Sequence, residues 1–466
     1  MKSITTLLVV SVTLATAACT VGPNYKRPVV QIPDAYRSAT PVDASSPRAA
    51  SLGDQKWWDV FDDTALQALI ATAVRQNFDV RIAAARMLQA QAQLGITRAD
   101  QAPTVNGNAG AARERLAQSL GLPALQTNAF DVQVSAAWEL DFWGKFRRAT
   151  EAARAELLAT RWGQRAVVTS LVSQVASAYF TLRALDLDLD IAQRTLASRR
   201  ESLRLTSVRA QGGATSLLDV RQAEQLVFGG AAEIASLERQ IEQQENLIST
   251  LLGDNPSSVM RGRPLTEQPR APDVPAGLPS ALLERRPDIA QAEQQLIATN
   301  ADIGVAKAAY FPQIALTGAA GWQSTALSTL FSGPAGLWSV GGALAQPIFT
   351  AGRTRARVDL AAARRDEASL VYQQTVQQAL RDVSDALIAY RKGREFREQE
   401  ELLARSAVDA RRLADLRYQG GATSYLEVLD SDTRLFSAEL GLADAQLSEQ
   451  LAFVQIYRSL GGSWQP

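Results

Sequence analysis

The chain lacks histidine altogether and has a single cysteine among its 466 residues. Without histidine, imidazole acid–base catalysis and histidine-ligated metal sites are excluded. One cysteine excludes an internal disulfide framework and a cysteine cluster that could hold a metal. Lysine plus arginine and aspartate plus glutamate each number 48, so no overall basic field indicates a nucleic-acid partner. We therefore expect neither a cofactor nor a nucleic-acid ligand.

Long hydrophobic runs are also missing. The mean hydropathy is −0.09, and no apolar run reaches the roughly 18 residues of a membrane-spanning helix. Hydrophobic residues still make up 46% of the chain, which is too many for a disordered tail. At this length the chain has room for several domains. Composition therefore favours a helix-rich protein without catalytic activity.

The N-terminus has the layout of a secretory signal peptide at residues 1–18. Lys2 is the charged start, Leu7 to Ala15 is the apolar stretch, and small residues precede Cys19. A lipoprotein signal peptidase would leave this cysteine as the first residue, so we expect a covalent lipid on Cys19. An ordinary signal peptide with an incidental cysteine is the alternative. Because one acyl chain anchors a protein only marginally, stable anchoring needs more chains or a second membrane element.

Residues 19–60 are predicted to form an extended N-terminal strap. Prolines recur in it from Pro23 to Pro47, and proline removes the amide hydrogens that a helix needs. Thr20 follows the cysteine, where lipoproteins kept in the inner membrane commonly carry aspartate, so the outer membrane is a compatible destination.

After the strap, the sequence is two copies of one plan. The segment from Arg209 to Val220 recurs from Arg417 to Val428 at an offset of 208, with nine of twelve positions identical. Repeated segments are to be recognised before a fold is assigned. We therefore predict an internal duplication, with a first structural repeat at 61–270 and a second at 271–466.

Each repeat is predicted to contain one very long helix. Proline is nearly absent from Pro103 to Pro256 and absent between Pro347 and Pro466, so helices can run without interruption. Residues 144–211 and 352–419 would each span about 100 Å at about 1.5 Å per residue. Their apolar residues recur at steps of three and four, which is typical of coiled-coil packing.

Between the helices the apolar residues change to a period of two. From Val132 to Phe142 the even positions are apolar, whereas Asp131, Gln133, Ser135, Glu139 and Asp141 lie on the opposite face. This alternation is typical of a membrane β-strand with one face toward lipid. The predicted strands are at about 103–118, 128–143, 312–325 and 337–350. Aromatic residues near their ends, typical of a membrane-interface belt, are Trp138, Phe142, Trp143, Trp322 and Trp338.

Four strands cannot close a transmembrane cylinder, because open sheet edges are not tolerated in lipid. If these strands enter a membrane, several chains must share one barrel: two chains give eight strands and three give twelve. Two soluble hairpins packed on helices are the alternative.

The residues resemble the outer-membrane factor family of TolC/OprM-like channels, in particular the lipoprotein branch of resistance–nodulation–division efflux systems. The resemblance covers nearly the whole chain. Its motifs are the stretch from Cys19 to Pro28, Trp57-Trp58 with Phe61, Arg285 to Ile289, Ala308 to Pro312, and the two Gln-Gly-Gly-Ala-Thr-Ser turns.

The resemblance implies a mainly α-helical homotrimer whose long helices form an α-barrel through the periplasm. Four strands from each chain would share a twelve-stranded outer-membrane β-barrel. Such a protein is a passive exit duct for small toxic compounds or drugs, gated at its periplasmic end. It opens when a periplasmic adaptor protein and an inner-membrane resistance–nodulation–division pump dock, and its lipid anchor lies in the outer membrane.

The two repeated turns, at 211–216 and 419–424, are predicted to be the tips of helical hairpins. Glycine just after a helix supplies a left-handed cap, and a threonine or serine oxygen caps the next helix. By resemblance these tips dock the adaptor. The residues concerned are Gly212, Gly213, Thr215, Ser216, Gly420, Gly421, Thr423 and Ser424.

Acidic residues lie just beyond the tips, at Asp219, Glu427 and Asp430. Glu427 and Asp430 are three apart and share a helix face. By resemblance they form the periplasmic gate, where rings of carboxylates repel one another and need compensating partners. The nearby candidates for those partners are Arg209, Arg417 and Tyr418. An ordinary solvated acidic helix face is the alternative.

Three other classes compete with an efflux channel. The run containing Asp186, Asp188 and Asp190 could indicate hydrolase or metal chemistry, although solvated carboxylates explain it as well and no phosphate-binding loop or zinc pattern occurs. A non-channel coiled-coil lipoprotein explains the helices but not the alternating strands. The channel of a type I protein secretion system shares the fold but exports protein.

Overall fold

The computed structural model describes residues 20–37, 56–116, 125–269 and 279–462. These residues fall into two compact units. We call the first the strand unit; it comprises residues up to Val29, Arg86–Arg161 and Gln291–Gln373. The second, the hairpin unit, comprises Val30–Ala85, Trp162–Ala290 and the residues from Gln374 onward. Each unit takes segments from both halves of the duplicated sequence, so the sequence repeats are not the spatial units.

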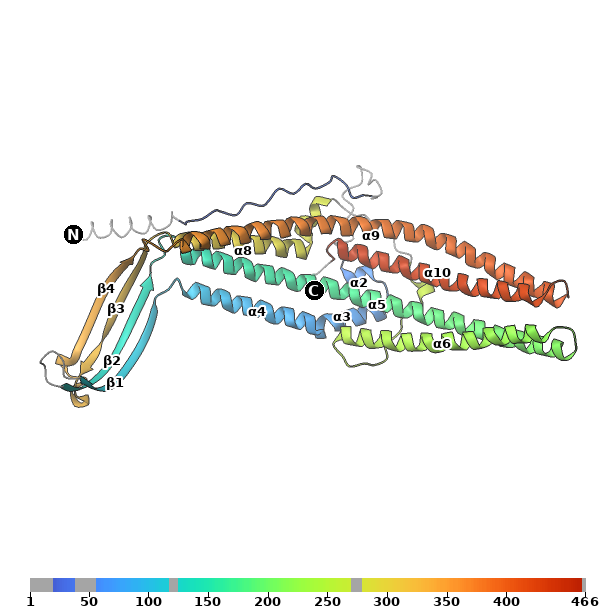
Figure 1. Cartoon of the computed structure of the whole chain (residues 1–466), viewed down its shortest axis with the longest axis horizontal. Helices are drawn as coiled ribbons and strands as arrows, with labels where there is room; N and C mark the ends of the chain where they lie inside the picture. Colours follow the sequence, from blue (N-terminus) through green and yellow to red (C-terminus); the bar gives the residue numbers. More distant parts are fainter. Residues whose placement is uncertain (1–19, 38–55, 117–124, 270–278, 463–466) are drawn as a thin grey trace. The chain divides into compact units, whose positions relative to one another are not determined.

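The strand unit contains one four-stranded antiparallel sheet in the order β1-β2-β3-β4 (Figure 1). Each sequence repeat contributes one hairpin, and the pairing of β2 with β3 joins the two hairpins. At one end of the sheet, all four strands connect to helices; we call this the helix-linked end. At the other end, each strand connects to its hairpin partner; we call this the loop end. The strands are β1 Thr104–Leu116, β2 Leu125–Glu139, β3 Gln313–Ser324 and β4 Gly336–Ala345.

The strand register gathers the alternating apolar residues onto one face of the sheet. Val132 on β2 lies opposite Trp322 on β3, and Ala320 on β3 lies opposite Trp338 on β4. Val105 on β1 lies opposite Ala136 in the same way. We call this face the apolar face. The opposite face carries the carboxylates of the described strands together with most of their amide and hydroxyl side chains; those carboxylates are Glu114, Asp131 and Glu139.

The last residues expected in two of the strands lie outside them. β2 ends at Glu139, because the carboxylate of Asp141 accepts the backbone amides of Phe146 and Arg147 at the start of the next helix. Leu140 and Phe142 therefore follow the strand. β4 ends at Ala345 and leaves Ile348 beyond it.

Two helices of 67 residues each, α5 Lys145–Gln211 and α9 Arg353–Gln419, confirm the predicted long helices. Both begin just after a glycine with positive φ, Gly144 at 77° and Gly352 at 83°. A residue with a side chain is strained in this conformation, so glycine suits the abrupt change from extended chain to helix. The two glycines hold equivalent positions in the two sequence repeats.

The strand unit holds the first parts of α5 and α9 and the last parts of two shorter helices that lead into the sheet, α4 Phe78–Ala99 and α8 Pro287–Ala308. Alanines from α5 and α8 make a small close-packed cluster there, formed by Ala152, Ala155, Ala298 and Ala301. Short 3-10 turns between β3 and β4 are η4 Leu327–Thr329 and η5 Gly333–Ala335.

The hairpin unit is helical. The remainder of α5 and α9 each turn back into a shorter helix, α6 and α10, and the pairs form two helical hairpins (Figure 1). The core side chains with the least exposure include Val175, Leu182, Tyr179, Val376 and Tyr457; several of these occupy the predicted three-and-four spacing. The other elements are α2 Trp57–Val60, α3 Thr64–Gln76, α6 Leu217–Leu252, η2 Leu265–Glu267, η3 Pro279–Ala281, α7 Leu282–Arg285 and α10 Tyr425–Ser459.

In the described part of the chain, none of the helices combines the length and the apolar character needed to cross a bilayer.

Candidate functional site at the hairpin tips

The first hairpin tip, between α5 and α6, is closed by a capping box. Gly213 has a φ of 71°, and the Ser216 hydroxyl accepts the backbone amide of Asp219. In return the Asp219 carboxylate accepts the Ser216 amide at 3.1 Å and the Thr215 hydroxyl. These hydrogen bonds, that from Thr215 first, hold the pKa of Asp219 below its usual value. The tip glycine and the capping residues thus form one rigid turn.

The second tip, between α9 and α10, differs from the first despite its nearly identical sequence. Gly421 again has a positive φ, 74°, but the side chain of Ser424 makes no cap hydrogen bond. Here Thr423 donates to Glu427, the longer acid that replaces Asp219 of the first copy. The extra methylene lets Glu427 also reach Arg417, with a nitrogen–oxygen distance of 3.2 Å.

The structure brings only some of the predicted gate residues together. Glu427 pairs with Arg417, and both side chains are exposed. Asp430 pairs with Arg434 on its own helix at 2.8 Å, also exposed. Two predicted partners do not reach the acids: the Arg209 guanidinium lies 4.5 Å from the centre of the Tyr418 ring and donates to the Tyr418 carbonyl oxygen. The ring of Tyr418 is buried, so it is unavailable to an acidic ring on the surface.

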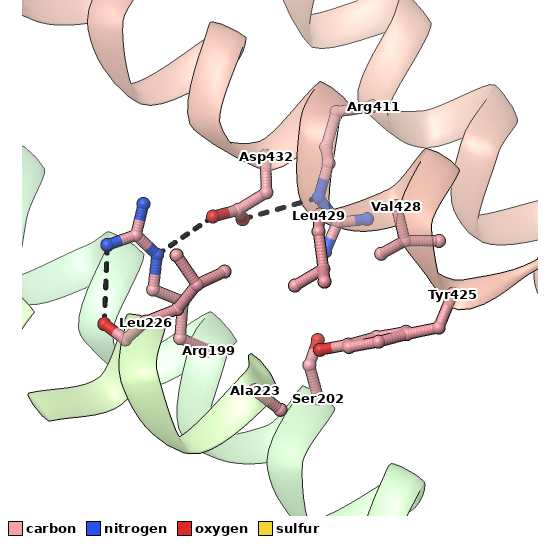
Figure 2. Close-up of a pocket in the computed structure, with 9 residues that line it drawn as sticks. All are labelled: Arg199, Ser202, Ala223, Leu226, Arg411, Tyr425, Val428, Leu429 and Asp432. Atoms are coloured by element: carbon pink, nitrogen blue, oxygen red, sulfur yellow. Dashed lines mark hydrogen bonds and ion pairs between the residues drawn. The ribbon is translucent and has the colours of Figure 1, made fainter. Parts of the chain in front are cut away.

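A buried ion network lies just behind the tips (Figure 2). Asp432 on α10 accepts from Arg199 on α5 at 2.8 Å and from Arg411 on α9 at 3.3 Å. All three side chains are at most 9% exposed. Arg411 also contacts the carboxylate of Asp415. Burial lowers the pKa of Arg411, but Asp415 and Asp432 together raise it above its ordinary value.

This network ties the two helical hairpins to each other. Arg199 belongs to the first hairpin, since it also donates to the carbonyl oxygen of Leu226 on α6 at 3.4 Å, whereas Asp432 and Arg411 belong to the second. An apolar cluster containing Tyr418, Tyr425 and Ala223 packs beside it. Buried charges are tolerated only when paired and hydrogen-bonded, so separating the hairpins here would leave charged groups uncompensated.

Asp432 and both arginines were not among the residues predicted from the sequence. At the offset of 208, Arg199 corresponds to Ala407 and Arg411 to Leu203. Comparing the two sequence repeats therefore does not reveal the network, because the two arginines are not present in both copies. The sequence did contain one signal for the network: at these positions an arginine in one copy is aligned with an apolar residue in the other.

The N-terminal strap is fixed to the strand unit beside the end of β2. Cys19 itself lies outside the described residues. Thr20 packs so closely on Gly144 that a Cβ there would lie 2.7 Å from the Thr20 methyl. The Val21 amide donates to the Trp143 carbonyl oxygen at 3.0 Å. The residue that follows the cysteine is thus held at the helix-linked end of the sheet.

Further along the strap, buried Glu293 on α8 accepts the Tyr25 hydroxyl at 2.9 Å and the Arg27 guanidinium at 2.6 and 2.7 Å. Burial raises the pKa of Tyr25 strongly, and the charge of Glu293 adds to the shift. The bidentate arginine–carboxylate contact is among the stronger pairings available to a surface segment. It holds this part of the strap in place although residues 20–37 form no regular secondary structure.

The predicted interface aromatics lie at two levels of the sheet. Trp138, near the helix-linked end, donates its indole N–H to the Gln101 carbonyl oxygen at 3.0 Å. Trp143 follows β2; it stacks on Phe311 and donates to the Pro312 carbonyl oxygen at 2.8 Å. Toward the loop end lie Trp322, which contacts Phe331, and Trp338, which is 80% exposed. Phe142 lies in the turn that follows β2.

Comparison with known proteins decides the family. Residues 69–254 and 278–462 match the family described as Outer membrane efflux protein. The chain belongs to that family. The two matched segments correspond to the two halves of the duplicated sequence, which confirms the predicted internal duplication.

Curated relatives of this efflux protein are similar over almost their full lengths. The cation efflux system protein CusC of Escherichia coli O6:H1 is 33% identical over 460 residues, covering 98% of this chain and 99% of the relative. The outer membrane protein OprJ of Pseudomonas aeruginosa is 36% identical over 457 residues, covering 97% and 95%.

Solved structures of outer-membrane channels share the fold. The outer-membrane channel OprN has a TM-score of 0.88 at 34% identity, with 96% of this chain and 100% of that chain covered. The open state of the MtrE outer membrane channel of Neisseria gonorrhoeae has a TM-score of 0.87 at 32% identity, with 96% and 99% covered. The predicted fold class, long helices with a small four-stranded region, is confirmed.

This protein is therefore an outer-membrane efflux channel component and not an enzyme. The family membership also rules out the alternative of a coiled-coil lipoprotein that forms no channel. The three aspartates behind the enzyme hypothesis do not act together. Asp186 pairs with Arg183 and Arg261, and Asp190 pairs with Arg194 at the surface. Within the described residues, no group of three or more acidic side chains is arranged to hold a metal ion.

Asp188, which lies between Asp186 and Asp190, is half-buried, and one of its carboxylate oxygens has no hydrogen-bond partner among the described residues. Burial, with Asp444 and Glu233 adding repulsion, raises its pKa from 3.8 to about 6. A raised carboxyl pKa means that the folded state prefers the protonated form. The resulting stabilisation is complete below about pH 4 and is lost as the pH rises through about 6.

Replacing Asp188 with asparagine is expected to weaken the pH dependence of helix unfolding between pH 4 and 7 and to stabilise the protein at pH 7. Thermal unfolding followed by circular dichroism measures both. Asp190→Asn, at the exposed neighbouring pair, is the matched control and should keep the wild-type slope. An Asp188→Asn slope equal to that of the wild type would refute the assignment.

Proposed function

We propose that three copies of this chain assemble into the exit duct of a tripartite efflux pump. Each copy contributes its four strands to one twelve-stranded outer-membrane barrel. The observation that supports this proposal is the sheet itself, which has one continuous apolar face and two open edges. In the described chain β1 pairs only with β2, and β4 only with β3.

Open edges are incompatible with lipid, since each unpaired backbone group costs several kcal/mol there. Pairing β1 of one copy with β4 of the next removes both edges. Residues 308–352, which include β3 and β4, contain no charged residue, as a segment facing hydrocarbon requires. Polar groups on the other face would then line an aqueous lumen.

Lipidation of Cys19 would supply a second membrane attachment. The secretory layout of the N-terminus and the fixed position of Thr20 beside Gly144 support it. An acyl chain on Cys19 would start next to the sheet, where it can enter the bilayer without pulling the strap away. Two attachments of this kind meet the requirement for stable anchoring.

The hairpin tips are proposed to dock a periplasmic adaptor protein, with a resistance–nodulation–division pump in the inner membrane supplying energy. Both tips expose the same apolar pair at equivalent positions of the duplication, Val208 with Leu218 and Leu416 with Leu426. These four side chains are between 55% and 65% exposed. Three copies would therefore present six similar tips, which suits a partner that binds the same small surface repeatedly.

The cargo is proposed to be small toxic compounds or drugs. Relatives carry names that refer to cation, toluene and antibiotic efflux. A strain lacking this protein is expected to become susceptible to such compounds, and the wild-type gene should restore resistance. Restoration by a variant with Leu218→Asp and Leu426→Asp should fail although the protein reaches the membrane. Unchanged drug susceptibility together with loss of a secreted protein would instead favour a type I secretion channel.

Glu427 and Asp430 are proposed to form the acidic gate, with Arg417 and Arg434 as their compensating partners. Replacing both acids with alanine is expected to raise the closed-state conductance of the purified channel in planar bilayers. The reason is that the ion pairs at the tip are lost on all copies. Glu224→Ala, an exposed ion pair on α6, is the matched control. Closed-state conductance equal to that of the wild type would count against this gate.

A further inference from the structure

Two arginines stand at the loop end of β1, on the face that is otherwise apolar. Val105, Ala109 and Ala111 occupy alternate positions of this strand, and the alternation continues into Arg113 and Arg115. The register places Arg113 opposite Asn128 and Arg115 opposite Gln126, on the same side as the apolar residues of β2. The apolar face thus ends in two cations.

Within the described residues, no acidic side chain pairs with either arginine. The nearest carboxylate in the sequence, Glu114, lies between them and therefore on the opposite face. Residues 117–124, which connect β1 to β2, contain no charged residue, and neither does the connection from β3 to β4. Both arginines are exposed, and neither makes a hydrogen bond or ion pair with another residue in the described part of the chain.

The arginines lie beyond the aromatic level of the sheet. Trp322 is opposite Val132, which in turn is opposite Ala109. Arg113 is four residues further along β1, about 13 Å at about 3.3 Å per residue. Aromatic rings mark the boundary between hydrocarbon and headgroups, so in the proposed barrel the arginines would fall in the headgroup layer.

That headgroup layer belongs to the leaflet opposite the lipid anchor. The strap begins at the helix-linked end of the sheet, where Thr20 contacts Gly144. An acyl chain on Cys19 would enter the leaflet at that end. The loop end, with both arginines, therefore meets the other leaflet.

We propose that Arg113 and Arg115 bind phosphate groups of a phosphorylated glycolipid at the outer surface of the membrane. The guanidinium group matches phosphate oxygens with two parallel N–H donors, and the acyl chains of the same lipid would lie on the apolar face. This inference rests on the proposed trimeric channel, in which three copies would place six arginines around the rim. The glycolipid then bridges neighbouring copies and holds the loop end of the barrel in the membrane.

The test uses the full-length purified protein in detergent and lipid A as the probe, in phosphorylated and chemically dephosphorylated forms. Native mass spectrometry counts the bound lipid and, in the same spectrum, the protein chains. We expect the wild type to prefer phosphorylated lipid A. Each cation near an anionic lipid surface strengthens binding about fivefold, so Arg113→Gln with Arg115→Gln should weaken binding roughly 25-fold.

Two variants keep the result interpretable. Glu114→Gln, on the same strand but the opposite face, should bind phosphorylated lipid A as the wild type does. Arg113→Lys with Arg115→Lys keeps the charges and should keep the preference for phosphate. Two results would overturn this inference but leave the proposed function intact. One is equal affinity of the wild type and of the Arg113→Gln, Arg115→Gln variant for phosphorylated lipid A. The other is a wild-type trimer that does not prefer the phosphorylated form. A wild type that is not trimeric would overturn the proposed function and this inference with it.

Discussion

Replacing Asp432 with alanine is expected to lower the free energy of unfolding by about 3–5 kcal/mol, because two buried guanidinium groups then lose their shared carboxylate. Arg411 keeps the contact with Asp415, whereas Arg199 keeps, among the residues that the structure describes, only the carbonyl oxygen of Leu226 and the ring of Phe436. Since the network joins the two hairpins, we also expect a higher closed-state conductance. Denaturant unfolding followed by circular dichroism and single-channel recording measure the two effects.

The matched control for the unfolding measurement is Asp430→Ala, two residues away on the same helix. Its ion pair with Arg434 is exposed, and exposed pairs contribute at most about 1 kcal/mol. Replacing all three buried charges together, as Arg199→Met, Arg411→Met and Asp432→Leu, should cost less than Asp432→Ala because no buried charge is left unpaired; Asp415, which loses Arg411, is 40% exposed. Equal stabilities of Asp432→Ala and Asp430→Ala would show that the buried network contributes nothing specific.

Replacing Val340 with arginine is expected to destabilise the membrane-inserted barrel by about 2–4 kcal/mol for each copy, the cost of a cation at the lipid-facing midplane. Val340 lies opposite Gly318 in the middle of the apolar face and is 82% exposed in the single chain. The neighbouring residue, Ser339, is on the other face, which the proposed trimer would turn toward the lumen. Resistance of the assembled trimer to heat in detergent gels measures the effect.

Ser339→Arg is the control that separates lipid exposure from a general intolerance of arginine on β4. It should assemble as well as the wild type, although it can alter conductance. Similar heat resistance in the two variants would mean that the faces are not divided between lipid and lumen. Loss of assembly in Ser339→Arg alone would mean that the faces are reversed.

The fold was predictable where a short-range pattern determines it. Period-two alternation identifies the strands, and the lack of proline permits two uninterrupted helices. The ends of strands were less predictable, because a competing local interaction decides them. Alternation continues through Leu140 and Phe142, yet the side chain of Asp141 already caps α5.

Pairing across the chain was the least predictable feature. Both hairpin tips were predictable, because the Gln-Gly-Gly-Ala-Thr-Ser turn is identical in the two copies. The different roles of the two acids at the tips could not be predicted from the repeated turns. Asp219 caps its own helix, whereas the side chain of Glu427 is one methylene longer and also reaches Arg417. Asp432 joins residues of three helices that are far apart in sequence, and no local spacing indicates such a group.

If identical copies share one sheet, the detergent-solubilised protein must contain more than one chain, and the number of chains can be measured. Sedimentation equilibrium under conditions that match the detergent density gives that number without reference to any partner. We expect three chains in a particle whose strands are retained, as measured by circular dichroism. A single chain that keeps its full content of strands and helices would contradict it.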